Sequence, residues 1–202
     1  DTLLKASSVC VLFIGIGGAM QHMLKITDGA LETSGSMMLI ICFVLGSIVG
    51  ELLDIEGAFE RFGAWLRKKT HNESDTGFLS AFIHASLTVC IGAMAIVGSI
   101  QDGLLGDSSL LCAKAALDAV IILVMTASMG KGCIFSAIPV ALLQGGVTLL
   151  SRVLAPIFTE AAIANLSYTG SVMIFCVGLN LVWGKKIKVA NLLPTLVFAV
   201  LY

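Results

Sequence analysis

The sequence predicts an all-α integral membrane protein, and three observations support this fold class. Only 12% of the 202 residues are charged and 57% are hydrophobic, and the mean hydropathy of +1.00 is far above that of soluble proteins. Seven apolar runs, each about long enough to cross a bilayer, occupy most of the chain. Lysine and arginine are concentrated in alternate connections between these runs. Because lipid offers the backbone no hydrogen-bond partners, each run is expected to be helical.

The seven runs leave no room for a soluble domain, so residues 1–202 are expected to form a single membrane domain. A transmembrane helix needs about 20 residues, with a range of about 17–25, and the last two runs are marginal by this criterion. In chain order, the predicted spans are Leu3–Leu24, Met37–Leu53, Phe78–Ile100, Ser108–Met129, Cys133–Leu154, Tyr168–Trp183 and Ile187–Tyr202.

The segment Ile55–Lys69 has a different pattern, because apolar residues recur at helical spacing among several cations. One interpretation is an amphipathic helix in the membrane interface, with Trp65 at headgroup depth. The other is a cytoplasmic extension of the second span that packs on the bundle. The sequence alone favours neither interpretation, and neither is catalytic.

The positive charges predict the orientation of the chain. If every run crosses the membrane, nine of the twelve Lys and Arg residues lie on one side and two on the other, with Lys114 inside a span. Cytoplasmic loops carry the excess of positive charge. The bias therefore places Asp1 and the loop 56–76 in the cytoplasm and the turn 101–107 outside. The nine are Lys5, Arg61, Arg67, Lys68, Lys69, Lys131, Lys185, Lys186 and Lys188, and the two are Lys25 and Arg152.

A faint internal repeat links the first and sixth runs, because Ser8–Ile16 resembles Ser171–Leu179 in residue type. By the charge count the two segments cross the membrane in opposite directions, which is typical of an inverted-topology repeat. The candidate repeat halves are about 1–70 and 131–202, on either side of a central helical hairpin at 77–130. Chance similarity between two apolar stretches is the alternative.

Asp118 is the strongest candidate for a functional residue, because it lies near the middle of the fourth run. A carboxylate at that depth costs about 2.5–3.5 kcal/mol on insertion scales. Lys114 precedes it by four residues, on the same helix face. We interpret the two as a buried pair beside a polar path, where Asp118 binds a cation or a proton. Alternatively, Lys114 extends towards the interface and Asp118 satisfies a neighbouring helix.

Four further polar residues are candidates for the same path. Gln101 and Asp102 lie in the Gly-rich connection between the third and fourth runs, where an ordinary turn is the alternative. Gln144 in the fifth run and Asn180 in the sixth are buried amides, which also serve simply to hold membrane helices together.

The fifth run also contains a candidate helix break. Pro139 removes one helical hydrogen bond, and Gly145 and Gly146 follow Gln144. Broken membrane helices expose backbone groups to ligands. A harmless kink is the alternative.

Several function classes lack support in the sequence. None of the common catalytic motifs of hydrolases or nucleotide-binding proteins is present, so we expect no catalytic residues and no enzyme activity. The six cysteines are dispersed one per run or run edge and the histidines are isolated, so we expect no metal site and no cofactor. There is no basic patch for nucleic acid.

Several motifs make the chain similar to the bacterial YqgA/YdfK-like membrane family, a domain of unknown function. The resemblance covers essentially the whole chain and implies a multi-pass protein of the bacterial inner membrane that is at most a presumed transporter. Family members usually begin with one more apolar helix, which implies eight spans if such a helix precedes Asp1. The motifs are Gly50–Glu56, Cys90–Gly98, Gln101–Gly103, Ala113-Lys114 with Leu117-Asp118, Phe135–Pro139 and Asn191–Pro194.

Two functional hypotheses follow. The first is a small secondary transporter or channel for a small solute or monovalent ion, with a polar path around Asp118. The second is a non-transporting accessory or sensor protein of the membrane, whose buried polar residues are structural. The GxxxG motif Gly46–Gly50 and the small residues of the third run further predict a homodimer in the lipid bilayer.

Overall fold

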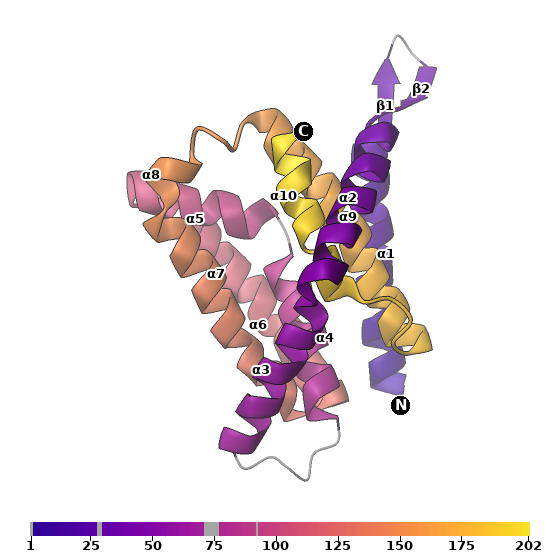
Figure 1. Cartoon of the computed structure of the whole chain (residues 1–202), viewed down its shortest axis with the longest axis vertical. Coiled ribbons are helices and arrows are strands. Elements are labelled where there is room, and N and C mark those ends of the chain that lie inside the picture. The colour runs from indigo at the N-terminus through magenta and orange to yellow at the C-terminus, as the bar shows by residue number, and fades with distance from the viewer. Residues whose placement is uncertain (1, 28–29, 71–76, 92) are drawn as a thin grey trace.

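The fold is a bundle of helices, most of which run roughly along the long axis of the molecule (Figure 1). The computed structural model describes residues 2–27, 30–70, 77–91 and 93–202. The elements are α1 (Thr2–Met23), β1 (Leu24–Thr27), β2 (Ala30–Thr33), α2 (Ser36–Leu53), α3 (Ile55–Lys69), α4 (Phe78–Cys90), α5 (Ala93–Leu105), α6 (Ser109–Met129), the 3₁₀ helix η1 (Lys131–Ser136), α7 (Ala137–Leu149), α8 (Ser151–Leu154), α9 (Glu160–Trp183), the 3₁₀ helix η2 (Val189–Leu192) and α10 (Pro194–Leu201).

The prediction of an apolar helical bundle is confirmed, whereas the number of spans is not. Among the described residues, four helices are long and apolar enough to cross a membrane, or five if the bent pair α4–α5 counts as one span. The helical stretches Ser8–Met23 and Val189–Leu201 are apolar but shorter. One feature was not predicted at all, an antiparallel hairpin of β1 and β2 that projects from the end of α1 (Figure 1).

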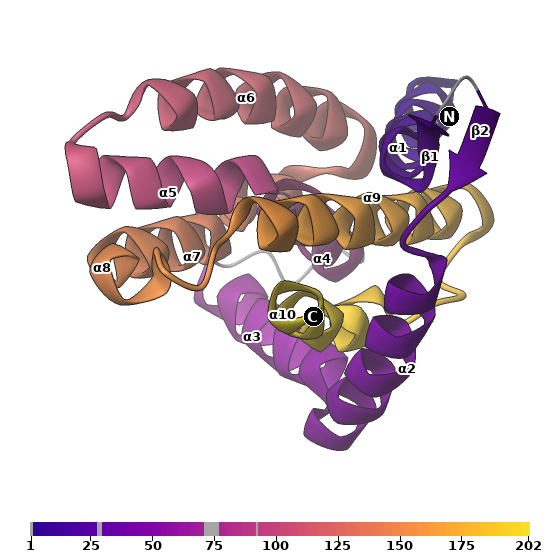
Figure 2. The same cartoon turned by 90° about the horizontal axis from the view of Figure 1, so that it is seen from above.

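The first and sixth predicted runs correspond to α1 and α9, which pack against each other over much of their length. α9 starts well before the predicted Tyr168, because the Thr159 hydroxyl caps the helix by accepting a hydrogen bond from the Ala162 N–H at 3.2 Å. Figure 2 shows α9 crossing the middle of the bundle, with α1, α4 and α10 around it. Glu160, Asn165 and Ser167 interrupt the apolar pattern at the start of α9, which explains why its start was missed in a search for apolar runs.

The α1–α9 contact is reciprocal. A Cβ atom on Gly15 would overlap the backbone of Phe175, and a Cβ atom on Gly178 would overlap the backbone of Leu12. Leu12 and Phe175 occupy matching positions in the two similar segments, as do Gly15 and Gly178. The helices run antiparallel, since Gly15 meets Phe175 while Leu12, three residues earlier, meets Gly178, three residues later. Only glycine allows backbones this close.

The Gly46–Gly50 motif packs within the chain. A Cβ atom on Gly46 would overlap the backbone of Thr195, and one on Gly50 would overlap the backbone of Asn191. This face of α2 is therefore covered by η2 and α10, and the argument from these glycines to a homodimer is wrong. Dimerisation itself stays a prediction.

The segment Ile55–Lys69 forms α3, which packs against α4 and η2. The chain turns sharply at Asp54, the one described non-glycine residue with positive φ, at 46°. Leu66 is buried, whereas Trp65 is half exposed and stacks on Phe62. The helix is thus a bent continuation of α2 packed on the bundle, with one aromatic ring left at its surface.

The third predicted span is not a single helix. α4 and α5 meet at an angle of 60°, and Ile91 after the end of α4 is extended, with φ −81° and ψ 113°. α4 is the centre of the main hydrophobic core, where Phe78, Phe82 and Leu87 are fully buried. The break therefore lies beside the best-packed part of the molecule.

The predicted break in the fifth span is corrected. α7 runs without interruption through Gly145 and Gly146, and a Cβ atom at either glycine would meet no atom within 4 Å. Pro139 lies in the first turn of α7, where proline costs little because that amide has no helical acceptor. The irregular part of this span is η1, which precedes Pro139 and packs against α4.

Candidate functional site

Lys114 and Asp118 form a buried ion pair on α6. The Lys114 ammonium contacts Asp118 Oδ2, and the side chains are only 8% and 21% exposed. The ammonium also donates a hydrogen bond to the backbone carbonyl of Val89, at 2.9 Å. Of the two interpretations of Lys114, the geometry supports the buried one, because its ammonium points into the protein.

The break between α4 and α5 explains why the ammonium finds an acceptor there. Val89 is in the last turn of α4, where backbone carbonyls have no intrahelical partner. The carboxyl end of a helix also carries partial negative charge, which favours a cation. The Lys114 ammonium therefore donates a hydrogen bond to a free carbonyl and interacts favourably with the dipole of α4, while the Asp118 carboxylate neutralises its charge.

A cavity of about 250 Å³ lies beside this pair, between α4, α6, η1 and α7. Asp118, Ser136 and Gln144 supply its polar lining, and the rest of its wall is mostly aliphatic. The structure thus brings together two of the predicted path residues, Asp118 and Gln144, with Lys114 directly behind Asp118. Ser136 was not predicted as part of the site.

The predicted residues Gln101 and Asp102 lie apart from this cavity. They are near the end of α5, where a Cβ on the next residue, Gly103, would overlap Thr148 and Ser151. Gly98 of α5 faces Leu111 of α6. Because the two helices run antiparallel, residues after Gly98 face positions before Leu111, so Gln101 and Asp102 lie farther from Lys114 than Gly98 does. Their prediction as part of one path with Asp118 has no support in the geometry.

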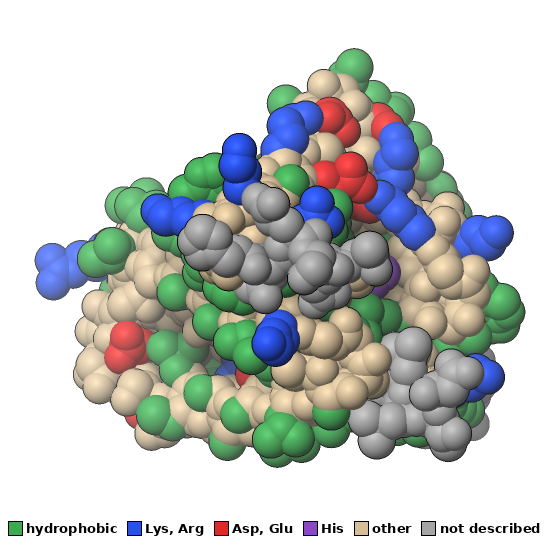
Figure 3. Space-filling view, turned by 90° about the horizontal axis from the view of Figure 1, so that it is seen from below, with side chains coloured by type: hydrophobic (Ala, Val, Ile, Leu, Met, Phe, Trp, Pro, Cys, Tyr) green, Lys and Arg blue, Asp and Glu red, His purple; other side chains and the backbone are tan. Residues whose placement is uncertain are grey.

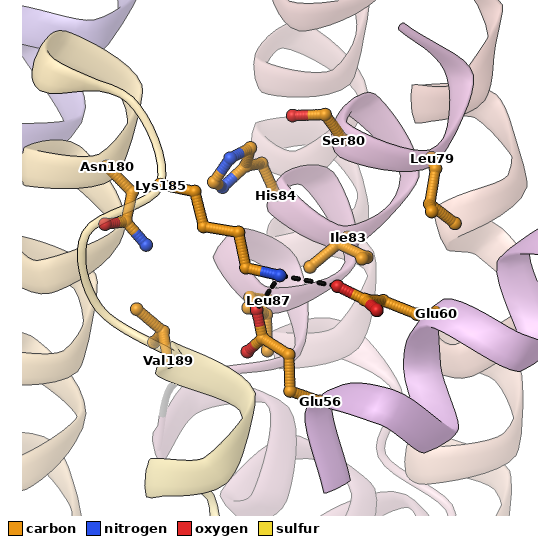
Figure 4. A pocket seen from close by; sticks show the side chains of 10 residues that line it. All are labelled: Glu56, Glu60, Leu79, Ser80, Ile83, His84, Leu87, Asn180, Lys185 and Val189. Atoms are coloured by element: carbon orange, nitrogen blue, oxygen red, sulfur yellow. Dashed lines mark hydrogen bonds and ion pairs between the residues drawn. The ribbon is translucent and has the colours of Figure 1, made fainter. Parts of the chain in front are cut away.

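Asn180 lies in a second polar pocket at the bottom end of the bundle, of about 230 Å³ (Figure 4). Its Oδ1 accepts hydrogen bonds from the Lys186 N–H at 2.9 Å and the Ile187 N–H at 3.0 Å. Its Nδ2 donates to the Ile187 carbonyl at 2.6 Å. All these partners are backbone groups of the connection after α9, so Asn180 fixes this loop.

A cluster of charged groups lies in this pocket, and we call Glu56, Glu60 and Lys185 the inner cluster. The Lys185 ammonium lies 2.9 Å from Glu56 Oε1 and 2.5 Å from Glu60 Oε1 (Figure 4). The hydrogen bond to Glu60, together with the contact to Glu56, raises the pKa of the Lys185 ammonium above its usual range. The Glu56 side chain is 7% exposed, whereas that of Lys185 is 51% exposed.

Further hydrogen bonds and a histidine complete the pocket. Glu56 Oε2 accepts a hydrogen bond from the Ala190 N–H at 3.1 Å, and the Glu56 N–H donates to Asn191 Oδ1 at 2.7 Å. The buried His84 points into the pocket from α4, and its Nδ1 has no hydrogen-bond partner among the described residues (Figure 4). The inner cluster therefore ties α3 to the connection after α9 and to η2.

The bottom face of the bundle, which contains this pocket, gathers many of the Lys and Arg side chains (Figure 3). This face includes α3 and the connection after α9, and therefore most of the cations assigned to the cytoplasm. The predictions for Asp1 and for residues 71–76 of the loop 56–76 lie outside the described residues.

A family model for a protein of unknown function (DUF554) matches residues 1–202, the whole chain. The chain belongs to this family. The uncharacterized membrane protein YdfK of Bacillus subtilis (strain 168) is 24% identical over 196 residues, which cover 97% of this chain and 80% of YdfK. The uncharacterized protein YqgA of Escherichia coli (strain K12) is 26% identical over 168 residues, covering 80% and 70% respectively. No solved structure matches the chain.

The family resemblance inferred from the motifs is thereby confirmed, and with the apolar helices it identifies a membrane protein. Neither relative carries a name that states an activity. The chemistry of the two pockets is therefore the basis for any assignment.

Glu56 was not predicted as a site residue, although the sequence contains a signal for it. Within Ile55–Lys69, Glu56 shares a helix face with Phe59, Gly63 and Leu66, at intervals of three and four residues. A carboxylate on the apolar face of an amphipathic helix needs a partner when that face is buried. The partner, Lys185, is far away in sequence and could not be identified from spacing.

Proposed function

We propose that the protein is a small secondary transporter or channel for a small solute or ion, and that its path passes Asp118 and Gln144. One observation supports this most strongly, namely the buried Lys114–Asp118 pair at the break of a helix, beside a cavity. Discontinuous membrane helices with ionisable residues are the usual construction of substrate and ion sites in transporters.

Energetics favour a functional role for the pair. Ionisable side chains inside a membrane are costly, and replacement of a buried ion pair by apolar residues is often neutral or stabilising. A pair needed only to hold helices together could often be replaced by packed aliphatic residues at little cost. The presence of both charges beside a cavity that Asp118, Ser136 and Gln144 also line therefore favours solute or ion binding.

The proposal includes an inverted-topology repeat that contains α1 and α9. The reciprocal contacts of Gly15 and Gly178 are those expected around a two-fold axis perpendicular to the helices. It also includes insertion into the bacterial inner membrane with the bottom face of Figure 1 in the cytoplasm, because that face carries most of the positive charge.

A second candidate function is an accessory or sensor protein that transports nothing. The inner cluster favours this alternative, because its charges join α3 to the connection after α9 and to η2 and have a clear structural role. The two candidates differ in one respect that can be measured, namely the access of water to the cavity beside Asp118.

Cysteine accessibility tests the proposal. We would substitute Gln144→Cys in the cavity and Leu142→Cys on the same helix, in a background without the six native cysteines. Leu142 is 70% exposed on the apolar surface and serves as the matched control. The thiolate is the nucleophile that attacks a thiol reagent, and it forms far more readily where water reaches the sulfur.

We expect a water-soluble, impermeant thiol reagent to label position 144 in proteoliposomes much faster than position 142, and ions or solutes that bind to slow the reaction. Equal, slow labelling at both positions would contradict a water-filled path and favour the accessory function.

A further inference from the structure

The inner cluster has two hydrogen-bonding positions without partners. An ammonium group has three N–H donors, and the Lys185 ammonium directs at most two of them to protein oxygens, Glu56 Oε1 at 2.9 Å and Glu60 Oε1 at 2.5 Å. Glu60 contacts Lys185 through this one oxygen. Among the described residues, the third donor of Lys185 and the second oxygen of Glu60 therefore have no partner. A position for a negative group and a position for a positive group lie side by side.

His84 adds an unmatched polar group to the same pocket. It is 8% exposed and points into the pocket from α4, and its Nδ1 has no hydrogen-bond partner among the described residues (Figure 4). In either charge state an imidazole carries at least one N–H donor, and the neutral ring also has an acceptor. Buried polar groups in native proteins nearly always have partners. A bound molecule that carries both a donor and an acceptor supplies one, whichever nitrogen holds the proton.

The remaining lining of the pocket sets the size and polarity of such a molecule. The cavity of about 230 Å³ is smaller than the roughly 300–1,000 Å³ of pockets that bind drug-sized ligands. It therefore suits a molecule about as large as a single amino acid. Most of its uncharged lining is aliphatic, and these side chains are Leu79, Ile83, Leu87 and Val189.

The charges around the pocket disfavour ions of a single sign. Glu56 and Glu60 repel an anion, whereas Lys185 and the many cations of the bottom face repel a cation (Figure 3). In the part of the chain that the structure describes, no three His, Cys, Asp or Glu side chains are placed to hold a metal ion. A small zwitterion meets neither objection, because it has no net charge and can set each of its charges beside the opposite one.

We propose that this pocket binds a small zwitterion, namely an α-amino acid with an aliphatic side chain. The ligand carboxylate accepts a hydrogen bond from the Lys185 ammonium, the ligand ammonium donates to the second oxygen of Glu60, and the ligand side chain packs on the aliphatic wall. The inference goes beyond the proposed function, because the pocket shares no lining residue with the cavity beside Asp118.

Binding to the purified wild type is the first test. Glycine, alanine, valine and leucine would be titrated by calorimetry, and unfolding temperatures would be measured with each. We expect saturable binding of valine or leucine and a rise of about 3–5 °C in unfolding temperature at roughly ten times the Kd. Glycine should bind more weakly, because it buries no side chain against the aliphatic wall. Absence of saturable binding for all four would overturn the inference.

Ligand analogues test whether both charges are recognised. The amino acid that binds most tightly would be compared with the amine that lacks its carboxylate and with the carboxylic acid that lacks its ammonium. Each analogue leaves one charged group of the pocket without its partner, so we expect each to bind at least about tenfold more weakly. An analogue that binds as tightly as the amino acid would contradict recognition of a zwitterion.

Variants of the pocket test its location. The side chains of Lys185 and Glu60 are 51% and 42% exposed, so Lys185→Met and Glu60→Gln should fold. We expect each to weaken binding at least about tenfold. The matched control is Lys188→Met, because Lys188 lies in the same connection but pairs with Glu51 outside the pocket. Wild-type affinity in Lys185→Met and Glu60→Gln would overturn the inference.

Asp118→Asn separates this inference from the proposed function. We expect the variant to bind the amino acid with wild-type affinity. Binding that is lost in Asp118→Asn but kept in Lys185→Met would place the ligand in the other cavity and overturn the inference. Equal, slow labelling at positions 144 and 142, together with amino-acid binding that depends on Lys185, would overturn the path beside Asp118 and leave this site in place.

Discussion

The Lys114–Asp118 pair and the inner cluster lie against the same helix, α4, but their charges are compensated in different ways. The first pair is surrounded by aliphatic side chains, and both its charges come from one turn of α6. The inner cluster draws its charges from α3 and the connection after α9, and Lys185 remains half exposed. The difference shows that a charge inside the apolar region needs a local, permanent partner, whereas a charge at the end of the bundle can connect distant segments.

The largest expected effect is on the mid-span pair. Lys114→Met keeps the length of the side chain and leaves the Asp118 carboxylate without a cation, so we expect a loss of about 3–5 kcal/mol in the free energy of unfolding. The measurement is unfolding in mild detergent with choline as the only monovalent cation. Addition of Asp118→Leu should restore most of the stability, and a single variant as stable as the wild type would show that the pair is not truly buried.

The inner cluster should respond less strongly to the removal of one charge. Glu56→Gln keeps the shape of the side chain and an oxygen for the Ala190 N–H, and Lys185 retains Glu60 and water. We expect a loss of about 1–2 kcal/mol, measured by the same unfolding method. A loss as large as that of Lys114→Met would remove the distinction between the two sites.

The pH dependence should also differ. The pKa of Lys185 is raised in the folded protein, chiefly by its hydrogen bond to Glu60. Its contribution to stability is therefore complete below the pKa of the unfolded chain, about 10.4, and is lost as the pH rises through the folded pKa. Between pH 9 and 11 we expect the wild type to lose more stability than Lys185→Met. If the free energy of unfolding fell equally with pH in the wild type and in Lys185→Met, the raised pKa of Lys185 would not contribute to stability.

The smallest expected change in the free energy of unfolding is at an exposed ion pair. Arg61 lies 3.2 Å from Asp54 Oδ2, and both side chains are more than half exposed. Arg61→Ala should therefore change the free energy of unfolding by at most about 0.5 kcal/mol, and added salt should reduce even this difference. A larger loss would indicate that the turn at Asp54 needs the ion pair with Arg61 for its stability.

The sequence was informative where the physical cause is local. Apolar runs predicted the helices, and the interval of four residues predicted that Lys114 and Asp118 share a face. The break after Cys90 was not predictable, because the run Phe78–Ile100 contains no proline and no charged residue, and hydropathy shows no boundary there. The predicted break at Pro139 was wrong because a proline in the first turn of a helix disturbs little.

The inner cluster shows a second limit of sequence analysis. Lys185 and Glu60 are 125 residues apart and meet only because α3 and the connection after α9 fold onto the same end of α4. Asn180 was predicted as a path residue because it is an amide inside an apolar run. It is instead a loop-fixing residue, and only its contacts reveal the difference.

The reciprocal glycine contact has a consequence for how the protein is made. Ribosomes synthesise α1 well before α9, but the partner that covers Gly15 is Phe175 of α9. Until α9 is inserted, the glycine face of α1 has no Phe175 backbone to pack against. α1 can therefore reach its final position only after the helices between it and α9 have been made.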